Sequence, residues 1–255
     1  MLKIVLIGGG NIAHHFFKVF SNHKSIDLIQ CYNRNLDKIK SFEKSTIITN
    51  NINELLEAAI YILAINDDAI PEFSNKLPFS NSLVVHTSGN VSMLDLNEKN
   101  RRGVFYPLQS FSKNKEVDFN EIPICIEAEN EADLNILKVL AETISSKVFK
   151  ISSEQRKILH VSAVFVNNFV NQLYYIGHDI CKKHDIPFEI LQPLIKETSK
   201  KIEEISPKEA QTGPAKRNDT ETINSHLELL TNEDYKNIYK LLTAAIIKTH
   251  GRKKL

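Results

Sequence analysis

Near its beginning the chain reads LKIVLIGGGNIA at residues 2–13, and the rest of the fold can be worked out from this stretch. The run before the glycines is apolar except for one lysine, a pattern typical of a strand that is buried on both faces. Gly8 to Gly10 then make a turn, and a helical pattern begins at Asn11. The chain is therefore predicted to open with a strand, a tight turn and a helix.

The first 150 residues continue this alternation. Further strands are expected at 26–32, 46–48, 60–65, 82–86, 104–106, 122–127 and 147–151. Further helices are expected at 36–42, 52–58 and 131–145. Strands that alternate with helices indicate an α/β fold with a doubly wound, mostly parallel sheet and right-handed crossovers.

The pattern changes near residue 152, after which no strand is expected. A very long helix is predicted at 153–184, followed by helices at 188–205, 220–230 and 232–250 and by a solvated basic end up to residue 254. We therefore expect two domains, an α/β domain at 1–151 and an all-α domain at 152–255.

The composition excludes several classes of protein. The 255 residues include 32 Lys+Arg and 31 Asp+Glu, a net charge of +1, so no basic surface for nucleic acid is expected. No run approaches the roughly 18 apolar residues that a membrane span needs. The three cysteines are far apart and odd in number, which favours reduced thiols in the cytoplasm over disulfides or a metal site.

The glycine turn has the form G-x-G-x-x-A, with Gly8, Gly10 and Ala13 at the fixed positions. This spacing after a strand and before a helix is typical of dinucleotide sites, the Rossmann pattern. The amides of Asn11 and Ile12 would then face a diphosphate at the helix N-terminus. The alternative is a glycine turn with only a structural role.

The end of the second strand indicates which dinucleotide is bound. An NAD site usually has Asp or Glu there, whereas this chain has Asn33 and Arg34. Arg34 could pair with a 2′-phosphate, so NADP is favoured as cofactor, unless Arg34 is merely a solvated side chain. Ala64 and Asn66, after the fourth expected strand, are predicted to face the cofactor as well.

Three further motifs carry a family resemblance: VHTSG at 85–89, FYPLQSF at 105–111 and TGPAKRND at 212–219. Together they resemble a bacterial family of Rossmann-like oxidoreductases with a C-terminal helical domain of unknown function. The usual histidine and glycine of that family are replaced here by Tyr106 and Asn218. Asn tolerates a positive φ, so the turn at 218 can survive.

The resemblance covers nearly the whole chain and extends in architecture to several reductases. These are pyrroline-5-carboxylate reductase, ketopantoate reductase, the β-hydroxyacid dehydrogenases and the deazaflavin-dependent NADP reductases. It implies a helical domain similar to the C-terminal domain of 6-phosphogluconate dehydrogenase. In those groups this domain supplies a substrate wall and usually a dimer interface, so a homodimer is expected.

Candidate catalytic residues come from the strand ends and from the long helix. His86 and Ser88 are expected to line the cleft, with Thr87 close to the cofactor; alternatively, they form a turn whose hydroxyls cap backbone amides. His160 and Asn168 share one face of the predicted helix and could face the cleft, because unpaired polar groups on an apolar helix are costly. The alternative for His160 is a core histidine bonded to a carbonyl.

Candidate substrate-binding residues are Tyr106, Gln109 and Arg217, of which Arg217 could clamp a carboxylate. Asp219 more simply caps the helix that begins at Thr220, by accepting from the Thr222 amide. We expect an NADP-dependent reductase or dehydrogenase of a small, carboxylated carbonyl or imine substrate bound between the domains. The alternatives are an NADP-binding sensor without turnover and a deazaflavin reaction, which no residue requires.

Overall fold

The computed structural model describes residues 1–113 and 115–250, so the predicted basic end beyond residue 250 lies outside it. The chain divides into two compact units, Met1–Phe165 and Val166–Leu255. The predicted boundary at 151 directly follows the last strand of the sheet, which ends at Lys150. The compact unit extends further because the helix at Ser153–Ala163 packs against the sheet.

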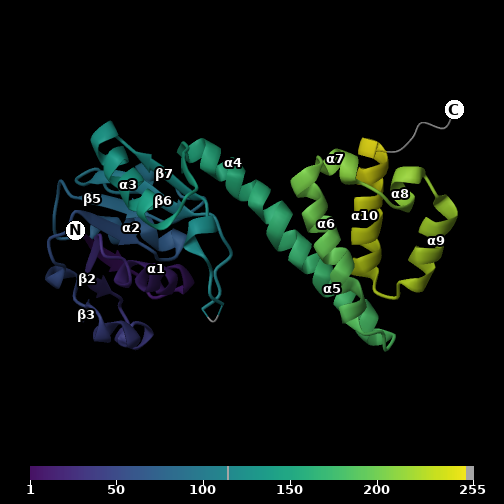
Figure 1. Cartoon of the computed structure of the whole chain (residues 1–255), viewed down its shortest axis with the longest axis horizontal. Helices are drawn as coiled ribbons and strands as arrows, with labels where there is room; N and C mark the ends of the chain where they lie inside the picture. The colour runs from purple at the N-terminus through teal and green to yellow at the C-terminus, as the bar shows by residue number, and fades with distance from the viewer. Residues whose placement is uncertain (114, 251–255) are drawn as a thin grey trace. The chain divides into compact units, whose positions relative to one another are not determined.

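One sheet organises the first unit (Figure 1). The strands found in the described residues are β1 Leu2–Ile7, β2 Ile26–Tyr32, β3 Ile47–Thr49, β4 Ile60–Leu63, β5 Leu83–His86, β6 Arg101–Pro107, β7 Ile124–Ala128 and β8 Val148–Lys150. Their order is β3-β2-β1-β4-β5-β6-β7-β8. All neighbouring pairs are parallel except β6 and β7. The predicted doubly wound, mostly parallel sheet is confirmed.

Helices cover both faces of this sheet. Helices α1 (Asn11–Ser21) and α3 (Glu131–Ile144) pack on one face, where Phe16 and Leu137 meet Ile4 and Leu6 in one buried cluster. Helix α2 (Ile70–Asn75), which the sequence analysis did not predict, packs on the other face, through Ile70. The order of the strands reverses between β1 and β4, and ligands of such sheets bind beyond the carboxyl ends of the strands at this point.

Two predicted helices are wrong. Residues 36–42 and 52–58 form only 3₁₀ turns, at Leu36–Lys38, Lys40–Lys44 and Ile52–Glu54. The reason is local: the Asn35 and Asn51 side chains accept hydrogen bonds from the amides two residues further along, at 2.9 and 3.1 Å. Such side-chain bonds compete with a regular helix.

The second unit is helical (Figure 1), and its described residues contain no strand. The predicted long helix begins in the first unit with α4 (Ser153–Ala163) and continues as a π-helical segment at Val164–Phe169 and as α5 (Val170–Lys183). The remaining helices are α6 (Gln192–Glu204), α7 (Pro207–Ala210), α8 (Pro214–Arg217), α9 (Thr220–Leu229) and α10 (Glu233–His250). In the described part of the chain, no helix combines the length and apolarity that crossing a membrane requires.

Candidate functional site

The glycine loop lies where the order of the strands reverses. Ile7, the last residue of β1, is in register with Tyr32 on one side and with Leu63 on the other. Gly8 therefore enters between the ends of three parallel strands. Its φ is +142°, and a Cβ at this position would lie 2.1 Å from the carbonyl oxygen of Ala64. Only glycine fits here.

The next two glycines have different surroundings. A Cβ on Gly9 would lie 2.0 Å from Nδ2 of Asn33, whereas a Cβ on Gly10 would meet no described heavy atom within 4 Å. Gly10 is also the N-cap of α1, and no described side chain caps the first turn of this helix. An uncapped helix N-terminus with open space before it suits a diphosphate, because its amides lack partners within the helix.

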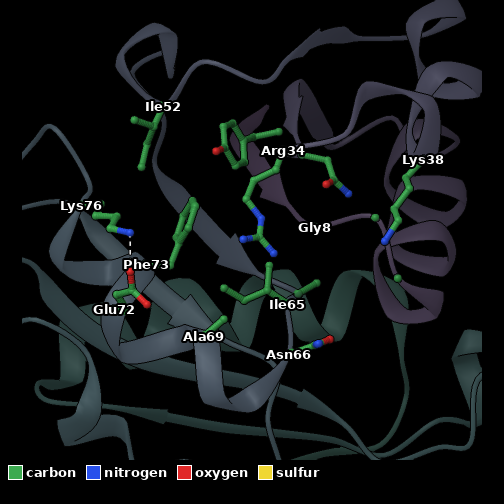
Figure 2. A pocket seen from close by; sticks show the side chains of 15 residues that line it. Gly8, Arg34, Lys38, Ile52, Ile65, Asn66, Ala69, Glu72, Phe73 and Lys76 are labelled. Carbon is green, nitrogen blue, oxygen red and sulfur yellow. Dashed lines mark hydrogen bonds and ion pairs between the residues drawn. The ribbon is translucent and has the colours of Figure 1, made fainter.

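A pocket of about 370 Å³ lies in front of the loop, a volume typical of small-molecule sites (Figure 2). One wall of it is apolar and includes Tyr32, Ile52, Ile65 and Phe73. The ring centres of Tyr32 and Phe73 lie 5.5 Å apart. A flat aromatic base is the kind of group that such a wall can hold.

The same pocket is electropositive, because its described lining includes Arg34, Lys38 and Lys76 but only one carboxylate, Glu72. Figure 2 shows the Arg34 guanidinium extending into the pocket between Phe73 and the glycine loop. Glu72 is paired with Lys76. The hydrogen bond from Lys76, and more weakly the charge of Arg34, hold the pKa of Glu72 below its usual range.

Six of the predicted cofactor-binding residues line this pocket: Gly8, Gly10, Asn33, Arg34, Ala64 and Asn66. The side chains of the other three lie elsewhere. Nδ2 of Asn11 donates to the Phe111 carbonyl at 2.8 Å, the Ile12 side chain packs against the core, and the buried Thr87 hydroxyl donates to the Leu63 carbonyl at 3.4 Å.

His86 and Ser88 follow β5 but are enclosed by protein. His86 has 0% of its surface exposed, and its Nδ1 accepts from the Ser88 amide at 3.2 Å. Its Nε2 has no hydrogen-bond partner among the described residues. Burial, and then the charge of Arg156, lower the pKa of His86 to about 3, so the ring is neutral at neutral pH. The Ser88 hydroxyl accepts from the amides of Asn90 and Val91, both at 3.0 Å. In this geometry both side chains accept hydrogen bonds from main-chain amides of the turn after β5, which is the alternative interpretation of these two residues given above.

Tyr106 and His160, by contrast, are brought together. The Tyr106 hydroxyl lies 3.2 Å from Nδ1 of His160, although the two residues are far apart in the sequence. Burial raises the pKa of Tyr106 to about 12, with smaller contributions from Cys125 and Asp67. Gly89 lies against both rings, because a Cβ there would come within 2.6 Å of His160 Nδ1 and 2.9 Å of Tyr106 Cζ.

Arg156, which the sequence analysis did not select, is the largest fully buried side chain of the described residues. Its Nε donates to the Ser88 carbonyl at 3.1 Å, and its other nitrogens bind the Glu127 carboxylate and the Val91 carbonyl. Arg156 therefore ties α4 to the turn after β5. It stands one helical turn before His160, and this i, i+4 spacing on α4 is the feature by which it could have been found.

Two other predicted residues have exposed amide side chains. Asn168 lies in the π-helical segment. Gln109 follows β6, and its Oε1 accepts from the Ser110 amide at 2.8 Å. Gln109 is not among the residues that line the pocket at the glycine loop. Their proposed roles stay predictions.

The TGP loop of the second unit contains Arg217, which is exposed and lies 3.8 Å from the Asp219 carboxylate. Asn218 has a φ of +55°, so the predicted left-handed turn is confirmed. Asp219 accepts from the Thr222 amide at 3.1 Å, which confirms it as the N-cap of α9.

Comparison with known proteins agrees with this arrangement. Residues 122–246 match the family model described as domain of unknown function (DUF2520). A proposed NADP oxidoreductase from Bacteroides fragilis is 38% identical, with a TM-score of 0.88 and coverage of 97% of this chain and 98% of that one. A comparison with curated proteins finds no match.

Two more distant structures share the fold. An imine reductase from Myxococcus stipitatus, solved with NADP⁺, is 12% identical, with a TM-score of 0.70 and coverage of 98% and 96%. A pyrroline-5-carboxylate reductase from Coxiella burnetii is 16% identical, with a TM-score of 0.58 and 99% coverage of both chains. At 38% identity over nearly its full length, the Bacteroides fragilis protein is a relative of this chain. The chain belongs with it to a family of Rossmann-like oxidoreductases whose C-terminal part is the domain of unknown function.

Proposed function

We propose that the protein is an NADP-dependent oxidoreductase that acts on a small, carboxylated carbonyl or imine compound. The observation that carries this proposal is the pocket at the glycine loop, into which Arg34 extends. Asn33 and Arg34 stand where an NAD site usually has a carboxylate. The relative named as an NADP oxidoreductase supports the same cofactor.

The lining of the pocket matches the parts of NADP. The uncapped N-terminus of α1 and the open space at Gly10 suit the diphosphate, and the wall formed by Tyr32 and Phe73 suits the adenine. Arg34, assisted by Lys38, would bind the 2′-phosphate through charge-assisted hydrogen bonds. When bound, the nicotinamide of NADPH supplies the hydride.

The substrate needs groups that orient it and a proton donor. Arg217 is exposed and only loosely paired with Asp219, so its guanidinium keeps donors for a substrate carboxylate. Asn168 and Gln109 offer exposed amides for the remaining polar groups of the substrate. Imine reduction is the reaction named for one protein of the same fold, which supports an imine as one of the two substrate classes.

We expect the protein to act as a homodimer. The second unit buries few apolar side chains: among residues 166–250 these are Ile176, Cys181, Ala215 and Ile223. Many others are exposed, including Phe169, Tyr175, Ile190, Leu194, Ile202 and Leu241. Apolar surface on this scale favours a partner, and a second copy is the simplest one.

The three cysteines are buried and none is paired. This agrees with the expectation of a reducing compartment such as the cytoplasm.

A sensor without turnover is the second candidate function. The observation that favours it is the setting of His86 and Ser88, whose polar atoms serve the turn after β5. A sensor would bind NADP in the same pocket but would oxidise or reduce nothing.

Calorimetric titration with NADPH and NADH tests the proposed cofactor, using the wild-type chain and Arg34→Ala. Loss of a charged hydrogen bond costs about 1.5–3 kcal/mol, so Arg34→Ala should weaken NADPH binding roughly ten- to hundredfold and leave NADH binding unchanged. Lys24→Ala is the matched control, because this exposed lysine precedes β2 at the opposite end of the strand.

Equal affinity for NADH and NADPH would contradict the role of Arg34. Absence of binding of both nucleotides would contradict the proposal that the protein uses a nicotinamide cofactor. If NADPH binds, oxidation of NADPH by panels of keto acids and cyclic imines separates the enzyme from the sensor. Turnover of any member supports the enzyme, and a complete lack of turnover supports the sensor.

A further inference from the structure

Tyr106 and His160 form a polar pair at the carboxyl edge of the sheet. Tyr106 is the penultimate residue of β6, and His160 lies on α4 within the same compact unit. Tyr106 is buried, with 8% of its surface exposed, and its hydroxyl lies 3.2 Å from Nδ1 of His160. Only β5 separates β6 from β4, and all three strands are parallel. Ala64 and Asn66, which follow β4, line the nucleotide pocket, so the pair lies at the same carboxyl edge of the sheet as the pocket.

The direction of this hydrogen bond follows from the chemistry of the two groups. Burial raises the pKa of Tyr106 to about 12, so the phenol keeps its proton at neutral pH. A phenol is the better donor and an imidazole nitrogen the better acceptor, so the hydroxyl donates to Nδ1. A neutral imidazole that accepts at Nδ1 carries its proton on Nε2. Among the described residues this Nε2 has no hydrogen-bond acceptor, which leaves it available to another molecule.

The surroundings of the pair hold this geometry. A Cβ on Gly89 would collide with both rings, so the main chain at Gly89 packs directly against them. Arg156 holds the preceding carbonyl, that of Ser88, at 3.1 Å. Because Arg156 and His160 are one turn apart on α4, the same buried arginine sets the position of the helix and of the turn.

We propose that His160 donates the proton of the reaction from Nε2, and that Tyr106 is the positioning residue that keeps Nδ1 an acceptor. The proposal rests on the proposed reductase function. The hydride adds to the carbon of the C=O or C=N bond, and the electron pair of that bond moves to the oxygen or nitrogen. This atom takes the proton from Nε2, and Nδ1 takes the proton of the Tyr106 hydroxyl. A proton from the bulk solvent then restores the phenol, so that each reduction consumes one NADPH and one H⁺.

Nitrogen NMR of the ¹⁵N-histidine-labelled full chain tests the tautomer. His160→Gln assigns the signals by their loss. The wild type should have a protonated Nε2 and an unprotonated, hydrogen-bonded Nδ1. In Tyr106→Phe the Nδ1 signal should move toward the position of an imidazole nitrogen that accepts no bond, while Tyr106→His should keep the bond. A protonated Nδ1 in the wild type, or an Nδ1 signal that is unchanged in Tyr106→Phe, overturns the proposal.

Two ligands then test whether His160 faces the reacting end of the cofactor. NADP⁺ should shift the His160 ring signals, and adenosine 2′,5′-bisphosphate, which lacks the nicotinamide, should leave them unchanged. Calorimetry on the same samples keeps the outcomes apart. If neither ligand binds, the proposed function fails; if both bind and His160 responds to neither, or to both equally, only the role of His160 fails.

Discussion

Substitution by alanine is expected to have opposite effects on folding at Gly8 and at Gly10. Gly10 has φ −84° and ψ −173°, an extended conformation that alanine adopts freely, and an added Cβ would meet no described atom within 4 Å. Gly10→Ala should therefore fold as well as the wild type, or gain about 0.4–1 kcal/mol through the less flexible unfolded chain. The added methyl group would instead occupy the space that suits a diphosphate.

The effect of Gly10→Ala on binding follows from the contacts it prevents. If a diphosphate loses two of the hydrogen bonds offered by the first turn of α1, each worth about 1.5–3 kcal/mol, the loss is about 3–6 kcal/mol. This corresponds to at least a hundredfold weaker NADPH binding. Gly8→Ala should lose binding because the fold itself suffers, since its Cβ would lie 2.1 Å from the Ala64 carbonyl oxygen at a φ of +142°.

The assay combines calorimetric titration with NADPH and thermal unfolding of both variants. The expected result is a normal melting temperature with lost binding for Gly10→Ala, and a lowered melting temperature for Gly8→Ala. Wild-type NADPH affinity in a folded Gly10→Ala protein would refute the placement of the diphosphate at α1.

Three further predictions concern the frame of the site. Arg156→Met should destabilise the first unit by about 3–5 kcal/mol, the cost of breaking a buried ion pair. The control Lys150→Met breaks an exposed ion pair and should not move the urea midpoint of unfolding. Hydrogen exchange of β5 to β7 in urea measures both variants, and equal effects would contradict the role of Arg156 as an anchor. Ser152 caps α4 by accepting from the Gln155 amide, so Ser152→Ala should cost about 1 kcal/mol in thermal unfolding and Ser152→Asp should restore most of it. The pKa of His86 is lowered to about 3 in the folded protein, below the roughly 6.5 of an unfolded histidine. Between these pH values the unfolded state binds one proton more than the folded state, so the free energy of unfolding falls by about 1.4 kcal/mol per pH unit as the pH decreases. His86→Asn should flatten the measured pH dependence by that one proton, and an unchanged slope would show that His86 is accessible to protons in the folded state.

The strands could be predicted from the sequence because each is a short apolar run. Ile26–Tyr32 is found as expected, and the glycine turn places it correctly beside β1. The failures at 36–42 and 52–58 have a local cause that apolar spacing does not reveal, since the side chains of Asn35 and Asn51 close single turns. The antiparallel pairing of β6 with β7 depends on the path of the chain rather than on the pattern of either strand.

The candidate site divides in the same way. Its nucleotide half is formed by residues that closely follow strands, so Gly8, Gly10 and Arg34 could be selected from their spacing alone. The pair of Tyr106 and His160 joins residues from separate elements, and their sequence contexts predict different roles, substrate binding for Tyr106 and catalysis for His160. The role of Arg156 is hard to predict from the sequence, because a lone arginine on a helix is usually solvated and only the tertiary structure shows that this one is buried.

The contact between Gly9 and Asn33 has a consequence for how this loop can change over evolution. A Cβ at position 9 would lie 2.0 Å from the Asn33 amide, so the two positions are not free to vary separately. An alanine at position 9 requires the side chain at 33 to rotate away or to be shorter, and the present Asn33 conformation requires glycine. Because residue 33 adjoins Arg34, drift in the turn and drift in nucleotide preference are expected to occur together among descendants of this chain.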